Sequence, residues 1–189
     1  MRNIRSCLIV LMLIFVLSAC SISKKNPDMM NIKSSKFSEE TKQILELIDE
    51  DIKFYDFFVD DTIKSFAINV SIYQNEEWLD QEVLSENIYK TDNRISMQMT
   101  EKGYIVSLLN NDGFTKYASP ELALGFDNIA QQFITTQILD TANIVVDEEI
   151  TLWIKIGNDK EKIIISPDFR KSDCTEGIAF TIIFSNNKL

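Results

Sequence analysis

Ile150-Thr151-Leu152-Trp153-Ile154-Lys155-Ile156 gives the clearest evidence for the fold class, because apolar side chains recur at every second position along it. A period of two places the isoleucines and Leu152 on one face of a β-strand and Trp153 on the opposite face. We therefore expect a half-buried strand here, with Trp153 either outside or in a second buried layer.

The segments that follow extend the β pattern to the C-terminus. Gly157-Asn158-Asp159 is a turn sequence that leads into a further expected strand at residues 162–166. Ile178–Ser185 then closes the chain with apolar side chains on both faces, which is typical of a strand in the centre of a sheet.

The same period recurs on the N-terminal side. Glu101-Lys102-Gly103 joins two alternating segments, so we expect a hairpin, and Asn110-Asn111-Asp112-Gly113 is a second turn signal. The expected strands are residues 54–59, 66–73, 77–84, 95–100, 104–109 and 114–118.

Two segments depart from this clean alternation. Residues 128–139 fit either a helix or a strand, and their β-branched side chains favour the strand slightly. Ser38 is a helix N-cap followed by two glutamates, so we expect a helix over residues 39–50. We expect its apolar stripe to pack on the core; the stripe consists of Ile44, Leu45, Ile48 and Ile52.

Many short strands after one helix predict a mainly β domain. We expect an antiparallel β-sandwich or a partly open barrel, preceded by one N-terminal helix, over residues 38–189. Residues 20–37 are polar and rich in lysine and serine, and we expect them to form a flexible tether.

The first residues have the layout of a secretory signal peptide. Arg2 and Arg5 precede an apolar run from Cys7 to Leu17, and small residues follow the run directly before Cys20. An uncleaved membrane anchor is the alternative, but the run is shorter than the roughly 20 residues that a spanning helix needs. An ordinary signal peptide is the other alternative.

Leu17-Ser18-Ala19-Cys20 resembles a bacterial lipobox. The resemblance implies that residues 1–19 are a lipoprotein signal peptide and that the Cys20 sulfur carries the lipid, whose fatty acids take up palmitate label. It also implies that the mature protein is held on the extracytoplasmic face of the cell membrane. The sparse glycine, the bias to Ile, Asn and Lys and the apolar ending resemble small lipoproteins of low-GC Gram-positive bacteria, a likeness that brings no activity to individual residues.

The charge balance narrows the choice of partners. The full chain carries a net charge of −10, and removal of Arg2 and Arg5 with the signal peptide leaves −12. This acidic balance argues against nucleic acid and against the domain lying flat on an anionic bilayer. A cationic peptide is a possible partner, although solubility alone also accounts for the charge.

Cysteine and histidine usage excludes several kinds of chemistry. Cys7 leaves with the signal peptide and Cys20 takes the lipid, so Cys174 has no partner for a disulfide and is expected to be an inert thiol. The chain contains no histidine, which excludes Ser-His and Cys-His nucleophiles and histidine-based metal sites. We therefore expect no catalytic residue of these kinds, no metal and no cofactor.

Acidic runs and one long polar loop are the remaining local features. Asp147-Glu148-Glu149 and Asp60-Asp61 lack the alternating pattern of a calcium loop and fit solvated turns better. The loop from Ser166 to Gly177 places Phe169 beside Arg170, an aromatic and a planar cation that a ligand could contact.

The candidate binding residues are Trp78, Trp153, Phe169 and Arg170. Each also fits core or rim packing, because aromatic side chains dominate cores. We expect a lipid-anchored binding module that recognises a peptide, a wall component or a protein outside the cell. The alternative is a carboxylate-dependent hydrolase acting on the cell wall, which needs two acids facing one cleft.

Overall fold

The computed structural model describes residues 30–48, 51–89, 92–110, 113–122, 132–137, 141–159 and 163–189. The expected signal peptide, Cys20 and the first part of the expected tether lie outside these residues. The elements are β1 (Asn31–Ser34), α2 (Glu39–Leu47), β2 (Ile52–Phe58), β3 (Ser65–Gln74), β4 (Glu77–Asn87), β5 (Asp92–Thr100), β6 (Gly103–Asn110), β7 (Gly113–Ala118), β8 (Gln132–Gln137), β9 (Thr141–Asn143), β10 (Glu149–Asn158), the short 3-10 helix η1 (Phe169–Lys171) and β11 (Glu176–Ser185).

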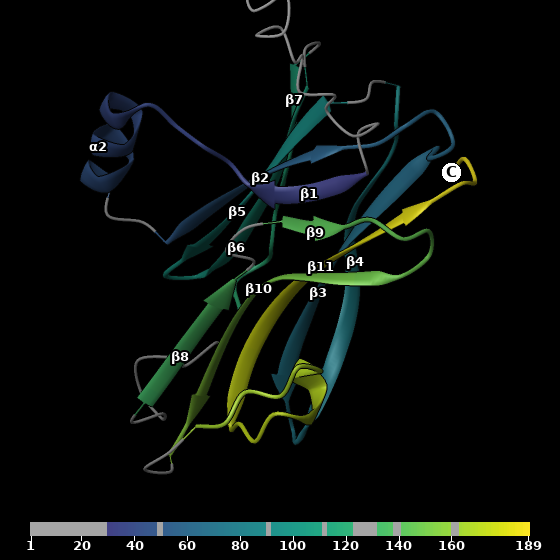
Figure 1. Cartoon of the computed structure of the whole chain (residues 1–189). Helices are drawn as coiled ribbons and strands as arrows, with labels where there is room; N and C mark the ends of the chain where they lie inside the picture. Colours follow the sequence, from purple (N-terminus) through teal and green to yellow (C-terminus); the bar gives the residue numbers. More distant parts are fainter. Residues whose placement is uncertain are drawn as a thin grey trace, which may run out of the picture.

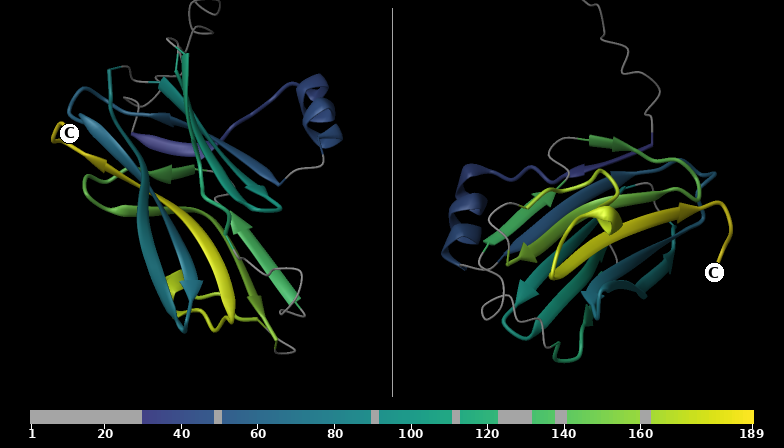
Figure 2. Two further views of the ribbon diagram at one scale, coloured as in Figure 1. Left: turned by 180° about the vertical axis from the view of Figure 1, so that it is seen from behind. Right: turned by 90° about the horizontal axis from the view of Figure 1, so that it is seen from below.

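Two antiparallel sheets form the scaffold, and neither is closed into a barrel (Figure 1). The six-stranded sheet has the order β7-β6-β5-β2-β1-β9, and the five-stranded sheet has the order β4-β3-β11-β10-β8. Figure 2 shows the two layers from behind and from below. The prediction of a mainly β, antiparallel fold is confirmed.

One hydrophobic core joins the inner faces of the two sheets. Phe57 of the six-stranded sheet packs edge-on against Phe66 and Phe184 of the other, with ring centroids 5.3 and 5.1 Å apart. The Tyr55 hydroxyl donates a hydrogen bond of 2.8 Å to the carbonyl oxygen of Leu152, across the two layers. Burial raises the pKa of Tyr55, because the ionised phenol loses its hydration.

Most predicted strands are confirmed. The expected hairpin of β5 and β6 turns at Glu101 and Lys102, and the expected strand after the next turn is β7, which pairs with β6. β11 lies in the centre of its sheet, between β3 and β10. The ambiguous segment 128–139 contains strand β8 over residues 132–137, while its ends lie outside the described residues.

Two expectations near the chain's ends are wrong. Residues 163–166 form no strand. The tether was expected to reach Phe37, but β1 pairs with β2 on one side and β9 on the other and buries Ile32 completely. The sheet therefore includes a strand before the helix, and the polar composition of this segment concealed one buried side chain.

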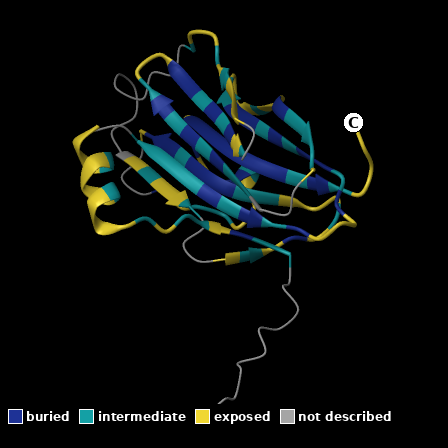
Figure 3. Cartoon of the chain, turned by 90° about the horizontal axis from the view of Figure 1, so that it is seen from above, coloured by how far each residue is buried: buried dark blue, intermediate teal, exposed yellow. Residues whose placement is uncertain are grey.

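The helix forms where expected but does not pack as expected. Ser38 caps it by accepting a hydrogen bond from the Thr41 backbone N–H, and none of its residues is buried. Ile44, Leu47 and Ile48 are exposed, with Leu47 at 84%, and α2 stands at the side of the molecule in Figure 1. Figure 3 shows the contrast between this exposed helix and the buried strands. The prediction that its stripe belongs to the core is therefore wrong.

A β-bulge interrupts β10, the strand whose alternation predicted the fold class. The pairing of β10 with β11 shifts between Thr151 and Trp153, so Leu152 and Trp153 both face the core between the sheets. Ile154 and Ile156 consequently face the outer side of the five-stranded sheet. The strand was predicted correctly, but its apolar side chains divide between the two faces of the sheet, because the one extra residue of the bulge reverses the alternation.

Candidate binding surface

A loop covers part of the outer face of the five-stranded sheet. We call residues 163–175, which include η1, the roof. A second hydrophobic cluster lies beneath it, made of Ile154, Ile156, Ile163, Phe169, Cys174 and Ala179, with Tyr73, Trp78, Ile134 and Ile165 packed at its margin. The long polar loop, in which Phe169 and Arg170 were candidates for ligand contact, therefore closes a small core of its own.

Trp78 and Phe169 meet in this cluster. Their ring centroids are 4.9 Å apart in an edge-on arrangement, and Trp78 also packs against Tyr73 at 5.4 Å. A Cβ atom at Gly177 would lie 2.6 Å from the Trp78 ring, so only glycine lets the ring lie against the strand here. Phe169 is only 1% exposed, and its ring is not available to a ligand.

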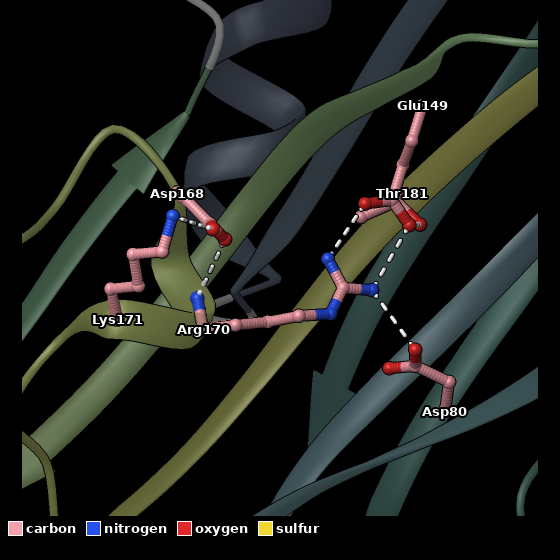
Figure 4. Close-up of polar contacts among 6 residues, drawn as sticks. All are labelled: Asp80, Glu149, Asp168, Arg170, Lys171 and Thr181. Atoms are coloured by element: carbon pink, nitrogen blue, oxygen red, sulfur yellow. Dashed lines mark hydrogen bonds and ion pairs between the residues drawn. The ribbon is translucent and has the colours of Figure 1, made fainter.

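Arg170 fastens the roof to the sheet (Figure 4). Its Nη1 and Nη2 atoms donate to the two Glu149 carboxylate oxygens at 2.7 and 3.1 Å, and Nη2 also donates to Asp80 Oδ2 at 3.0 Å. Thr181 Oγ1 donates to the same glutamate at 2.9 Å. The hydrogen bonds from Arg170 to Glu149 are the main cause of its raised pKa.

A second ion pair shapes the turn that presents Arg170. Asp168 accepts a hydrogen bond of 3.2 Å from the Arg170 backbone N–H and contacts Lys171 Nζ at 3.0 Å (Figure 4). The hydrogen bond from Lys171 is the main reason why the pKa of Asp168 lies below its usual value. The Asp168 contacts hold the turn, and the guanidinium contacts with Glu149 and Asp80 hold the side chain. Arg170 is therefore a structural clamp within the protein.

Trp153 lies apart from the other three predicted binding residues. It is 1% exposed and stacks on Phe180 in the core between the sheets, with centroids 5.2 Å apart. Lys53 Nζ lies 5.5 Å from the Trp153 ring centroid. The structure thus brings Trp78, Phe169 and Arg170 together at the roof, whereas Trp153 packs on the opposite side of the same sheet, in the core between the two sheets.

The outer face of the six-stranded sheet is open by comparison. Strand pairing aligns one row of outward side chains across five strands, and a second row lies one step further along the strands. The first row is Lys33, Asp56, Arg94, Leu109 and Phe114, and the second is Phe54, Ser96, Ser107 and Lys116. We call these two rows the open face.

An ion pair occupies the middle of the open face. Arg94 Nε and Nη2 donate to the two Asp56 carboxylate oxygens at 2.6 and 3.2 Å, and Ser35 Oγ donates to Asp56 at 2.8 Å. Partial burial alone would raise the pKa of Asp56, but these hydrogen bonds and the charges of Arg94 and Lys33 outweigh it, so the pKa is lowered. Asp56 therefore stays ionised at neutral pH.

Aromatic and apolar side chains flank this pair. The Phe37 ring packs edge-on against Phe54 at 5.1 Å, and the Arg94 guanidinium carbon lies 5.0 Å from the Phe37 centroid. On the other side, Leu109 is 50% exposed and Phe114 is 73% exposed. Leu109 and Phe114 are paired across β6 and β7, so they form a small apolar patch on the pleated surface.

A groove of about 490 Å³ runs along this face. Its lining residues are Lys33, Asp56, Phe57, Phe58, Asn93, Arg94, Leu109 and Asn110. Sequence analysis missed this site, because the side chains come from different strands and meet only through the strand register. The apolar character of Phe114 was visible in the sequence, but the face on which it lies was not.

The described residues contain little that points to catalysis. They include no group of three or more acidic or cysteine side chains placed to hold a metal ion. Four grooves lined by described residues each hold at most one carboxylate. Among these residues no helix is long and apolar enough to cross a membrane.

Comparisons of the chain with protein-family models, with curated proteins and with solved structures gave no match.

Proposed function

We propose that this protein is a lipid-anchored, extracytoplasmic binding module that interacts through its open face. The observation that carries the proposal is the difference between the two outer faces. The roof covers part of one face and engages three of the four predicted binding residues, Trp78, Phe169 and Arg170, in internal contacts. The other face exposes Leu109 and Phe114 beside a groove. The two packed sheets serve as a rigid β-sandwich scaffold for that face.

The address of the module is part of the proposal. The resemblance of Leu17-Ser18-Ala19-Cys20 to a lipobox supports lipidation at Cys20. Only ten residues separate Cys20 from β1, so the first residue of the sheet lies within about 40 Å of the anchor even at full extension. The proposed anchor thus keeps the open face near the membrane, where tethering raises its local concentration toward any partner there.

The hydrolase alternative gains no support from the described residues. Retaining and inverting glycosidases need two carboxyl groups roughly 5–9.5 Å apart. Asp56 is the one carboxylate of the groove on the open face, and Arg94 and Ser35 already bind it.

Lipid labelling tests the anchor. Cells grown with radioactive palmitate should label the wild-type chain, and Cys20→Ala should abolish the label. Label retained on the variant would contradict lipidation at this cysteine.

Photo-crosslinking tests the surface. A photoreactive phenylalanine analogue at Phe114 in intact cells should give an adduct, whereas the same analogue at Ile164, which is exposed on the roof, should not. Equal adducts at both positions, or none at Phe114, would contradict the open face as the interaction surface.

A further inference from the structure

The charge of the open face is opposite to that of the chain. Three of its side chains are cationic, Lys33, Arg94 and Lys116, and one is anionic, Asp56, which gives a net charge of +2. The full chain carries −10. The expectation that net charge would keep the domain off an anionic bilayer therefore does not apply to this face, because attraction at short range depends on the charges that face the surface.

The same face exposes the side chains that enter a head-group region. Phe114 and Leu109 are neighbours across β6 and β7 and are both at least half exposed. Lys116 lies one step further along β7, on the same side of the sheet. Aromatic and apolar side chains that project beside basic ones are typical of surfaces that bind at the boundary between head groups and acyl chains.

The proposed tether brings this sheet to the membrane. β1 carries Lys33 and is the first strand in the described part of the chain, with Lys24 and Lys25 in the sequence between it and Cys20. Basic side chains near an anionic surface each contribute about 1 kcal/mol to attraction. Those of the open face therefore continue a basic segment that begins beside the lipid.

We propose that the open face docks on the anionic lipid head groups of the membrane that holds the anchor. This inference rests on the proposed lipid anchor and names the partner of the proposed binding surface. Docking directs the roof and the acidic remainder of the domain away from the membrane. The anchor fixes the protein to the bilayer, and the open face fixes its orientation.

A fluorescent label on the open face tests the docking. The lipidated protein carries Cys174→Ala, to leave one reactive thiol, and Ser107→Cys, which lies between Ser96 and Lys116. It is reconstituted in vesicles of phosphatidylcholine with or without phosphatidylglycerol, each containing nitroxide-labelled lipid as a quencher. Glu82→Cys, exposed on β4 of the other sheet, provides the control position.

We expect strong quenching at Ser107→Cys only when phosphatidylglycerol is present, and weak quenching at Glu82→Cys in both vesicles. Lys33→Gln with Lys116→Gln should lower the ratio of docked to undocked protein about 30-fold. Lys155→Gln with Lys171→Gln removes the same charge from the five-stranded sheet and the roof and should leave the ratio nearly unchanged.

Quenching that does not depend on phosphatidylglycerol, or that falls equally with both lysine pairs, would overturn the docking. In that case a photo-crosslink from Phe114 to a protein in cells would still support the proposed binding module, but with a protein as its partner. Absence of palmitate label on the wild-type chain would instead contradict the proposed lipid anchor, so failure of the docking and failure of the anchor are distinguishable.

Discussion

At the scale of single residues, two arginine–carboxylate pairs act on opposite sides of the domain. Arg170 binds Glu149 and Asp80 and closes the roof, whereas Arg94 binds Asp56 in the middle of the open face. Both pairs use the planar fork of the guanidinium, which a lysine cannot reproduce. About a third of each arginine side chain is exposed, so each pair contributes modestly to stability and mainly fixes geometry.

Replacing Arg170 by lysine tests the clamp. Arg170→Lys keeps the charge but loses the two parallel hydrogen bonds, so it should destabilise the roof by about 1 kcal/mol. Cys174 is a buried residue of the roof, and its reaction with Ellman's reagent should become about fivefold faster when the roof loosens. Lys116→Gln removes a charge from β7 of the other sheet, leaves the roof contacts intact and should not accelerate the reaction; equal rates in all three proteins would contradict the clamp.

The buried thiol gives a pH-dependent prediction. Burial, together with the negative charge of Asp173, raises the pKa of Cys174 to about 11. Because the unfolded thiol ionises near pH 8.5, the unfolded state loses its proton first as pH rises. The stability that this neutral thiol contributes is complete below about pH 8.5 and is lost toward pH 11.

Thermal unfolding between pH 7 and 11 checks this sign. The melting temperature of wild type should fall more steeply above pH 8.5 than that of Cys174→Ala, because only wild type carries the thiol. The raised pKa values of Tyr55 and Tyr104 affect both proteins equally. Parallel curves would show that the thiol is not protected in the folded state.

At the scale of elements, the sequence predicted strands better than it predicted their faces. β10 was correctly identified by its alternation, yet the bulge before Trp153 sends Ile154 and Ile156 to the roof side. A bulge depends on the partner strand and leaves no periodic signal in the sequence. The alternation therefore predicted that the aliphatic side chains of β10 lie on one face of the sheet, whereas they lie on both. β1 was missed because a four-residue strand with one buried side chain is too short to show a period.

The exposed helix leads to a prediction at this scale. Ile44→Ser, Leu47→Ser and Ile48→Ser should each change the free energy of unfolding by no more than about 0.5 kcal/mol, because none of these side chains is buried. Ile32→Ala in β1 removes a fully buried side chain and should cost about 2–5 kcal/mol. Urea denaturation of the four variants measures these free energies of unfolding. Large losses of stability in the three helix variants would show that the helix packs on the core.

The start of the domain provides another prediction. A chain beginning at Ser38 lacks β1, so β2 and β9 lose their shared partner and the core loses Ile32. It should be at least about 3 kcal/mol less stable than a chain beginning at Ser21. Equal denaturation midpoints would support the original boundary at residue 38 and would mean that β1 adds nothing.

At the scale of the whole molecule, the fold class followed from the sequence and the candidate surface did not. Alternation and turn residues act locally, so they predicted the antiparallel strands and the central place of β11. The open face depends on register across five strands, which aligns Lys33 with Asp56, Arg94, Leu109 and Phe114. Net charge also failed as a guide, because an average of −10 hides a face of opposite sign.

The acidic run beside β10 separates net charge from specific contact. Glu148→Gln and Glu149→Gln change the charge of the molecule equally, but only Glu149 binds Arg170 and Thr181. At low salt Glu148→Gln should leave the melting temperature unchanged or raise it, because it reduces the repulsion within an acidic chain. Glu149→Gln should lower the stability by about 1–2 kcal/mol, because it leaves Arg170 with one carboxylate partner instead of two.

Added salt screens repulsion between exposed charges, so the effect of Glu148→Gln should disappear while most of the loss in Glu149→Gln persists. If both variants respond alike at low and high salt, the acidic run acts only through net charge, and Arg170 does not hold the roof.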